Sequence, residues 1–324
     1  MKIAFIIDPI DKLDPGHDST VAMMEAAQIL GHEIYAVYAH QLSIVKGKAQ
    51  AFLQPVQLTP VELVEGRWIA ADPWYRVSPG NWQSLEAMDA ILMRLDPPVT
   101  IPYLYITQTL DLIDPKKTLV LNSPRGLQAA NEKLYALNFP TVIPETIVSS
   151  EKVIIQQFLE EKGAAVLKPL GGKAGEGILF LQEGDRNFNS LIEISTKWGR
   201  EPVMVQQYLP AAADGDKRII VVEGEPIGAV NRIPTGKEFR GNMAVGGRVA
   251  KTEISDRERE ICAAVAPKLK EDGLYFVGLD VIGGYLTEVN VTSPTGIREI
   301  DRLDDTRLGK QVIQWIEKQL IMDN

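Results

Sequence analysis

Strands alternate with helices over the first third of the chain, and this alternation restricts the fold more than any other feature of the sequence. Four apolar runs have the length of buried strands: residues 3–7, 34–38, 90–94 and 119–122. An apolar pattern at 21–30, which ends at Gly31, predicts a helix after the first strand. Such alternation favours a parallel sheet with helices on both faces. Residues 50–84 contain several prolines, and we expect loops with a short hairpin there.

The pattern changes after Pro144 to one of antiparallel strands. Ahead of this change, a turn at 123–124 opens a helix that we predict at 125–137. A strand at 164–169, a glycine-rich loop and a strand at 178–182 predict a hairpin rather than a strand–helix–strand unit. The remaining elements are helices at 152–162 and around 188–198, and strands at 203–208, 218–222, 226–233, 276–282 and 285–291.

One helix between these strands has clearly marked ends. Ser255 followed three residues later by Glu258 is a capping box, and Gly273 terminates the helix. Its apolar stripe recurs every four residues: Ile261, Val265 and Leu269. Cys262 lies beside this stripe, so we expect a packed core thiol rather than a nucleophile.

Composition excludes several classes of protein. No apolar run in the 324 residues approaches the length of a membrane span, and the first apolar run is stopped by Asp8, which favours a buried strand over a secretory signal. The formal charge of −9 argues against nucleic-acid binding. A single cysteine cannot form an internal disulfide, which fits the cytoplasm. The histidines lack metal-ligand spacing, and we expect ordinary surface or loop residues: His17, His32 and His40.

Two polar residues near the C-terminus suggest a metal site. Glu288 and Asn290 project from the same face of a predicted strand, and Asp280 on the preceding strand is the natural third ligand. A two-residue loop at Gly283 and Gly284 would turn Glu288 away from Asp280, so we expect a loop of odd length. Oxygen ligands without His or Cys favour Mg²⁺ over zinc. The alternative is a solvated strand face with unrelated polar residues.

A glycine-rich loop follows the strand at 164–169. Its glycines leave backbone N–H groups free to approach phosphate oxygens, and it lacks the patterns of a Walker A loop and of a dinucleotide fingerprint. Lys168 ends the apolar strand, where a lysine is unexpected unless its ammonium has an anionic partner. The four glycines are Gly171, Gly172, Gly175 and Gly177. Alone, such a loop is usually only a turn.

Two further segments have the composition of binding loops. The strand at 203–208 ends in polar residues and a proline, which suits a hinge whose backbone pairs with an adenine edge. The loop at 232–248 offers forked cations, an amide and free N–H groups, as a transferring phosphoryl group requires: Arg232, Arg240, Asn242, Gly246, Gly247 and Arg248. The alternatives are an ordinary turn and a long basic loop.

These segments, in this order, resemble those of the ATP-grasp fold. The particular residues in them resemble those of prokaryotic glutathione synthetase. The resemblance spans nearly the whole chain. It rests on residues 8–10, 18–19, 92–98, 131–134, 167–170, 214–218, 240–248 and 287–295, of which 94–98 and 292–295 are the specific part. It implies an N-terminal substrate-binding (pre-ATP-grasp) α/β domain at 1–122 and an ATP-grasp domain of the α+β class at 123–318, with a lid subdomain at about 141–202.

The family's activity implies a set of roles for these residues. ATP phosphorylates the cysteinyl carboxylate of γ-glutamylcysteine, glycine attacks the acyl phosphate, and glutathione, ADP and phosphate result. Carried onto this chain, the nucleotide contacts are Lys133, Lys168, the four loop glycines, Gln206, Gln207, Tyr208, Leu209 and Asp216. The catalytic residues are Arg218, Arg240, Asn242, Gly246 and Gly247. The substrate-binding residues are Ser19, Arg94, Arg232, Ser293 and Thr295, and the Mg²⁺ ligands are Asp280, Glu288 and Asn290, with Mn²⁺ as a substitute.

Two other readings stay open. One is a different ATP-grasp carboxylate–amine ligase, such as a D-alanine ligase or a glutamate-adding enzyme. The other is a nucleotide-binding module without catalysis, which the complete oxygen-ligand set disfavours. We expect small-molecule partners only, no nucleic acid and no membrane, and leave homo-oligomer formation open.

Overall fold

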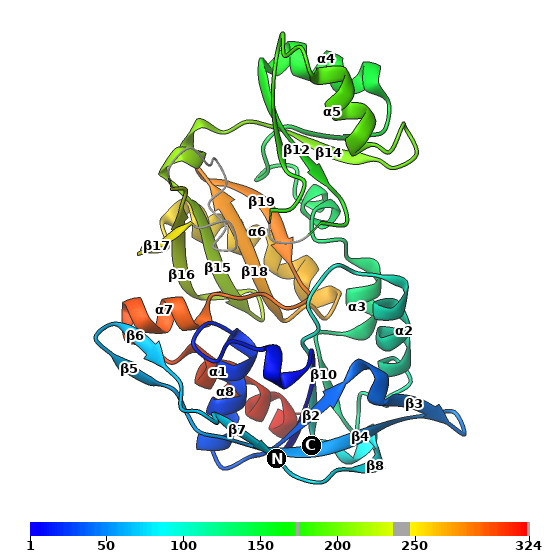
Figure 1. The fold of residues 1–324 in the computed structure, drawn as a ribbon, viewed down its shortest axis with the longest axis vertical. Coiled ribbons are helices and arrows are strands. Elements are labelled where there is room, and N and C mark those ends of the chain that lie inside the picture. Colours follow the sequence, from blue (N-terminus) through cyan, green and yellow to red (C-terminus); the bar gives the residue numbers. More distant parts are fainter. Residues whose placement is uncertain (173–174, 236–246, 323–324) are drawn as a thin grey trace.

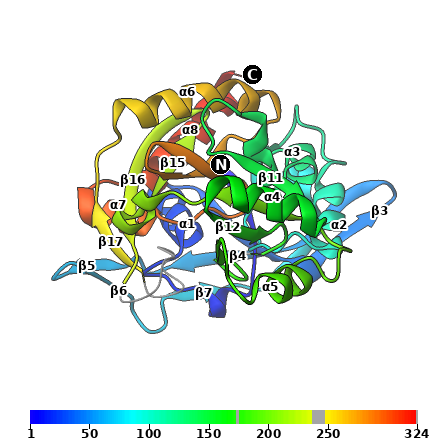
Figure 2. The ribbon, with the colours of Figure 1, turned by 90° about the horizontal axis from the view of Figure 1, so that it is seen from above.

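The computed structural model describes residues 1–172, 175–235 and 247–322. Three sheets follow one another from bottom to top in Figure 1: the N-terminal sheet, the sheet that carries β15 and β18, and a small sheet beneath α4 and α5. Figure 2 shows α4 and α5 from above, over the rest of the molecule. Within these ranges no helix is both long and apolar enough to span a membrane.

The first sheet has a parallel core. Its strand order is β10 (Leu119–Leu121), β9 (Ala90–Met93), β1 (Lys2–Ile7) and β2 (Glu33–Tyr38), all parallel, as predicted. Alternate residues of β1 enter two different cores, which shows that both faces are covered. Ile3 and Phe5 pack with residues of α1 (Ser19–Ile29) and α8 (Leu308–Met322). Ala4 and Ile6 pack with residues of α2 (Ile101–Leu110).

The expectation of loops at 50–84 is wrong for most of that segment. Antiparallel strands extend the sheet there, and the longest, β4, pairs with β2 through Tyr35 and Pro55. Buried Ala49, Ala51 and Leu53 alternate along β4, but short alanines give a weak apolar signal and the prolines suggested breaks. The strands are β3 (Leu42–Val45), β4 (Lys48–Leu58), β7 (Tyr75–Val77) and β8 (Asn81–Ser84), with a separate hairpin of β5 (Glu62–Val64) and β6 (Arg67–Ile69).

The helix predicted at 125–137 is divided into two pieces. Helix α3 (Pro124–Ala129) stops, and a 3-10 helix begins at Leu134. Between them the Asn131 side chain accepts hydrogen bonds from the backbone N–H groups of Lys133 (3.1 Å) and Leu134 (3.0 Å). An asparagine that bonds to its own backbone in this way competes with the helical ladder. The break places Glu132 and Lys133 at the cavity described below.

The other two sheets are antiparallel and contain all the strands predicted after residue 144, together with two edge strands, β11 and β17, that were not predicted. The small sheet has the order β11 (Thr146–Ser149), β14 (Val203–Gln207), β12 (Ala164–Pro169) and β13 (Leu179–Gln182), with α4 (Lys152–Lys162) and α5 (Phe188–Ser195). The third sheet has the order β17 (Arg248–Lys251), β16 (Glu225–Ile233), β15 (Asp216–Val222), β18 (Phe276–Ile282) and β19 (Tyr285–Asn290), followed by α7 (Ile297–Asp304).

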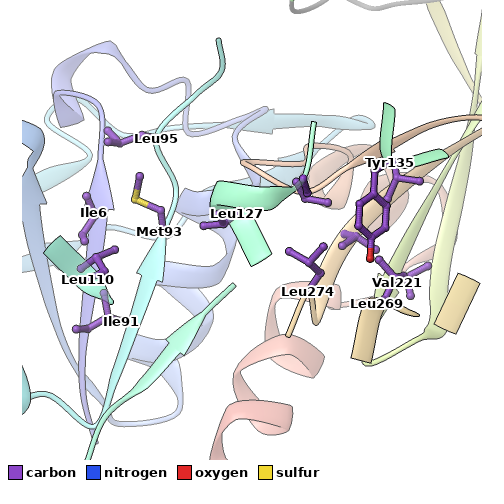
Figure 3. Close-up of a cluster of buried hydrophobic side chains, with 14 of the residues drawn as sticks. Ile6, Ile91, Met93, Leu95, Leu110, Leu127, Tyr135, Val221, Leu269 and Leu274 are labelled. Atoms are coloured by element: carbon purple, nitrogen blue, oxygen red, sulfur yellow. The ribbon is translucent and has the colours of Figure 1, made fainter. Parts of the chain in front are cut away.

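Helix α6 (Asp256–Glu271) confirms its predicted start and stripe. The Ser255 Oγ accepts from the Glu258 N–H, while the Glu258 carboxylate accepts from the Ser255 N–H at 2.8 Å. Cys262 is 1% exposed, and burial raises the pKa of its thiol to about 12, so it is a core residue as expected. The core continues from the first sheet through Leu127 of α3 to Leu274 and Leu269, as Figure 3 shows.

A buried amide joins the first and third sheets. Asn122, which follows β10, donates to the carbonyls of Phe276 and Val291 (2.8 Å each) and accepts from the Phe276 N–H at 2.8 Å. These two residues lie at the start of β18 and just after β19. Asn122 therefore fixes the ends of the two strands that carry the predicted metal ligands.

We expect Asn122→Ala to lower the free energy of unfolding by about 2–3 kcal/mol, because it leaves buried backbone groups without partners. Urea denaturation monitored by circular dichroism measures this. Asn187→Ala, at an exposed position whose side chain makes no cap bond, is the matched control and should change stability by less than about 0.5 kcal/mol. Equal stability of both variants would contradict the joining role of Asn122.

Candidate active site

A cavity of about 260 Å³ is lined by the second and third sheets and by N-terminal loops. The small sheet contributes Val166, Lys168 and Gln206. The third sheet contributes its polar face: Asp216, Arg218, Arg232, Asp280, Glu288 and Asn290. Most of the predicted site residues within the described ranges therefore face one space.

The register of β18 and β19 brings the predicted metal ligands together. Asp280 is paired with Glu288, and Asn290 lies two residues further on the same face. The shared face was predicted correctly, but its cause was not. Gly283 and Gly284 form a two-residue turn with φ of 55° and 78°, and the extra residue is a β-bulge at Thr287. The bulge, rather than an odd loop, restores Glu288 to the face of Asp280.

Asp280 lies between two arginines at the base of the cavity. Arg218 donates to it from Nε (2.5 Å) and Nη2 (3.1 Å), and the Arg232 Nη2 lies 2.9 Å from its Oδ1. Burial opposes ionisation of Asp280, but the two guanidinium groups outweigh burial and hold its pKa well below the ordinary value. Asp280 therefore stays a carboxylate at neutral pH.

Asp216 completes this buried charge network. Its Oδ2 accepts from the Arg232 Nη2 at 2.6 Å. Burial raises the pKa of Asp216, and the nearby arginines only partly oppose this rise. The pKa of Arg232 is also above its ordinary value, because the charges of Asp216 and Asp280 together outweigh the effect of burial. Two carboxylates and two guanidiniums thus balance in charge beneath the cavity.

The oxygen-bearing side chains fit a divalent cation that completes its shell with other ligands. Within the described ranges no three His, Cys, Asp or Glu side chains gather into a metal cage. The donors here are two carboxylates and one amide, and the Asn290 amide lies 3.2 Å from Asp280 Oδ2. Such a partial oxygen set suits Mg²⁺, which keeps waters and binds phosphate oxygens.

Two lysines, buried Lys133 and half-buried Lys168, face the same space. Lys133 lies 3.1 Å from the Glu288 carboxylate and donates to the Gly172 carbonyl at 3.1 Å. Lys168 donates to the Gln206 amide oxygen at 2.8 Å and to the Thr287 carbonyl at 3.4 Å, and burial lowers its pKa. Its direct partners in the described part of the chain are thus neutral oxygens. The charges of Glu288, Asp216 and Asp280 favour the ammonium, and an anionic ligand in the cavity would add a direct ionic partner.

The predicted nucleotide-binding segments are only partly at the cavity. Gln206, Gln207, Tyr208 and Leu209 all line it. Of the four loop glycines, Gly172 and Gly175 line it, whereas Gly171 and Gly177 do not. The Asn131 side chain donates to the Leu170 carbonyl at 2.9 Å and so ties the start of this loop to the segment of Lys133.

The predicted substrate residues divide into two groups. Ser293 and Thr295 line the cavity, and Ser293 Oγ donates to Asp96 at 2.6 Å. Ser19 and Arg94 lie behind it and hold the same segment: Ser19 Oγ accepts from the Ile297 N–H at 3.1 Å, and Arg94 Nη2 donates to the Pro294 carbonyl at 3.0 Å.

Part of the predicted catalytic loop lies outside the described residues: Arg240, Asn242 and Gly246. Gly247 is described and does not line the cavity.

Several cavity residues were absent from the predicted set, and three of them are titratable residues that stand close to predicted ones: His17, Asp96 and Glu132. Asp96 and Glu132 stand in motifs that carried the resemblance, so their positions beside Arg94 and Lys133 could have indicated them. His17 does lie in a loop, as expected, but it lines the cavity and contacts buried Glu299. Nothing local in the sequence connects His17 with Glu299.

Solved structures share this architecture. D-cycloserine synthetase DcsG matches with a TM-score of 0.63 at 13% identity, over 99% of this chain and 100% of that chain. The ATP-grasp ligase PsnB, solved with a precursor peptide and AMPPNP, matches with a TM-score of 0.62 at 17% identity over 98% of each chain. These likenesses, together with the arrangement of the sheets, define the ATP-grasp fold.

Sequence relatives identify the family. Residues 1–128 match the model for the prokaryotic glutathione synthetase N-terminal domain, and residues 132–305 match that for its ATP-grasp domain. The chain belongs to the prokaryotic glutathione synthetase family. Proteins named glutathione synthetase are 65% identical in Nostoc sp., over all of both chains, and 66% identical in Synechocystis sp., over 98% of this chain and 100% of that protein. One from Coxiella burnetii is 40% identical over 98% of this chain and 96% of its own length.

The charge network predicts different effects for two carboxylates of the site. Asp280→Asn leaves Arg218 buried without its carboxylate and should cost about 3–5 kcal/mol of stability. Glu288→Gln, the control, removes one ion pair of a partly exposed side chain and should cost less than about 1 kcal/mol. Chemical denaturation at pH 7 measures both, and similar losses would contradict the network.

The stability loss caused by Asp280→Asn should depend on pH. The folded-state pKa of Asp280 is depressed, so its contribution is present above the unfolded-state pKa of about 4 and is lost as the pH falls through the folded value. The difference between wild type and Asp280→Asn should therefore shrink only in acid.

Proposed function

We propose that this chain joins γ-L-glutamyl-L-cysteine to glycine with ATP, giving glutathione, ADP and phosphate. The chain is an ATP-dependent ligase of a family whose members use a divalent metal, and proteins named glutathione synthetase are 63–66% identical to it over at least 98% of its length. One observation of the site carries the proposal. The ammonium of Lys168, whose direct partners are neutral, lies in the same cavity as a partial set of oxygen ligands, as a polyphosphate with its metal ion requires.

The reaction needs two displacements. A cysteinyl carboxylate oxygen attacks the γ-phosphorus of ATP, a P–O bond forms and the bond to ADP breaks. The glycine nitrogen then attacks the acyl carbon, the bond to phosphate breaks and the amine loses a proton. Neither step requires a nucleophile from the protein, so the chain acts by positioning its substrates and neutralising charge.

The nucleotide would occupy the side of the cavity formed by the small sheet. The adenine would be bordered by Gln206, Gln207, Tyr208 and Leu209. Gln206 would also orient Lys168, because its amide oxygen accepts a hydrogen bond from the Lys168 ammonium. Lys133 and Lys168 would contact phosphate oxygens, and Gly172 and Gly175 would approach them with backbone N–H groups. Asp216 would act mainly by holding Arg232 in place.

The third sheet would hold the metal ion and the transferring group. Asp280, Glu288 and Asn290 would bind Mg²⁺, with Mn²⁺ as a substitute, and this ion would neutralise phosphate charge. Arg218 and Arg232 would keep Asp280 ionised and oriented, and Arg218 also fixes the Thr295 carbonyl at 3.1 Å. Ser293 and Thr295 would contact the dipeptide, while Ser19 and Arg94 would support their segment.

Other features of the proposal rest on the sequence. We retain the domain division at 122/123, the lid at 141–202, and the roles of Arg240, Asn242, Gly246 and Gly247 as predictions. The cytoplasmic location, the lack of nucleic-acid partners and the oligomeric state are also predictions.

Purified protein with ATP, Mg²⁺, γ-glutamylcysteine and glycine should form glutathione and ADP in equal amounts. Mass spectrometry measures the glutathione, and a coupled assay measures the ADP released. Omission of glycine should abolish glutathione formation. Absence of turnover with this pair, together with turnover of a different carboxylate and amine, would contradict the substrate assignment.

Glu288→Gln should reduce turnover by roughly 10²-fold or more, the size of loss expected for one electrostatic group at a reacting centre. Its melting temperature should stay within a few degrees of wild type, because Glu288 is partly exposed and has one ionic partner. Glu161→Gln, at an exposed position of α4, is the control and should keep full activity. A large loss of thermal stability in Glu288→Gln would show that the residue is structural.

A further inference from the structure

His17 is fixed at the wall of the cavity by a turn that precedes α1. Its N–H donates to the Asp14 carbonyl at 3.0 Å, and the next residue, Asp18, caps α1 by accepting from the Thr20 N–H at 2.6 Å. The His17 side chain is 43% exposed and lines the cavity, as does Asp96 from the first domain. The backbone around His17 is thus set by local hydrogen bonds, which leaves its imidazole to face the cavity.

Glu299 holds one side of this imidazole. It lies in the first turn of α7, is 7% exposed, and its Oε1 contacts the His17 Nδ1. The helix itself is anchored to α1: the Ile297 N–H donates to Ser19, and Arg298 is ion-paired with Glu25 at 2.7 Å. In Figure 1, α1 and α7 lie next to each other below the third sheet. Both members of the His17–Glu299 pair are therefore held by fixed elements.

The surroundings of His17 favour its cationic form. The hydrogen bond to Glu299 raises the pKa of His17 and outweighs burial, and the charges of Glu299, Asp14 and Asp18 act in the same direction. Asp96 adds a further carboxylate to the lining of the same cavity. With Nδ1–H directed to Glu299, the Nε2–H is the ring donor left over for a ligand in the cavity. An imidazolium in this setting can bind an anionic group of a ligand.

The position of His17 indicates which anionic group this is. The proposed nucleotide side is formed by β12 and β14, which lie above the third sheet in Figure 1, whereas His17 precedes α1 below it. The dipeptide presents its cysteinyl carboxylate to the phosphates. Its glutamyl end, which carries an α-carboxylate, must then extend away from the nucleotide.

We propose that His17 binds the α-carboxylate at the glutamyl end of the dipeptide and that Glu299 is a positioning residue that orients the His17 ring. This inference rests on the proposed function and adds a substrate-binding residue to it. This contact would select substrates that carry a carboxylate at the glutamyl end. A substrate without that carboxylate would leave the imidazolium without an anionic partner from the ligand.

Steady-state kinetics of His17→Gln tests this assignment. The KM for γ-glutamylcysteine should rise roughly 10- to 100-fold, the size of one charge-assisted hydrogen bond, while kcat and the KM values for ATP and glycine stay within about twofold of wild type. His40→Gln, an exposed histidine of the same domain, is the matched control and should behave as wild type. Melting temperatures of all variants check that they are folded.

The pH profile separates recognition from a structural role. Wild-type kcat/KM for the dipeptide should fall as the pH rises through the His17 pKa, because the imidazolium loses its proton. His17→Lys keeps a cation to about pH 10 and should abolish this fall. Glu299→Gln removes the group that raises the His17 pKa, so the fall should move to lower pH.

The outcomes are distinguishable. If the wild type makes no glutathione from the three substrates, the proposed function fails, and this inference fails with it. If the wild type is active but His17→Gln leaves the dipeptide KM within twofold, the inference alone is wrong. A rise confined to the glycine KM would also overturn it, because the carboxylate bound would then be that of glycine.

Discussion

The ion pairs between Asp280 and the arginines Arg218 and Arg232 determine the geometry of the site. These side chains come from β15, β16 and β18, three adjacent strands, so the pairs fix the polar face of the third sheet. Buried ion pairs contribute little net stability, because desolvation offsets much of the Coulomb attraction. Their presence here is better explained by function, since they keep Asp280 ionised next to Glu288 in a cavity that also contains Lys133 and Lys168.

The N-terminal region and the third sheet form the site jointly. Asn122 holds the Val291 carbonyl, while the Glu132 carboxylate accepts from the N–H groups of Val291 (2.9 Å) and Thr292 (3.0 Å). The segment that follows Asn290 is therefore held on both sides before it reaches Ser293. Helix α8, near the C-terminal end of the chain, packs against β1 of the N-terminal sheet. Residues that would contact the nucleotide and the dipeptide are thus fixed in one framework.

Much of the fold could be predicted because local signals agreed with it. The bounds of β12 follow from an apolar run, and α6 begins at its capping box. The bulge at Thr287 could not be predicted, because it depends on how β19 pairs with β18 rather than on the residues of the turn. Asn131 interrupts the predicted helix through bonds to the N–H groups of Lys133 and Leu134, which the apolar pattern of this segment did not reveal. The contact between Glu299 and His17 joins opposite ends of the chain and had no local signal at all.

A crystal structure with ADP, Mg²⁺ and the dipeptide tests the central claim most directly. The account predicts an ion about 2.0–2.1 Å from oxygen atoms of Asp280, Glu288 and Asn290, with phosphate oxygens completing its shell. An ion bound elsewhere, with these three side chains at distances too long for coordination, would contradict it.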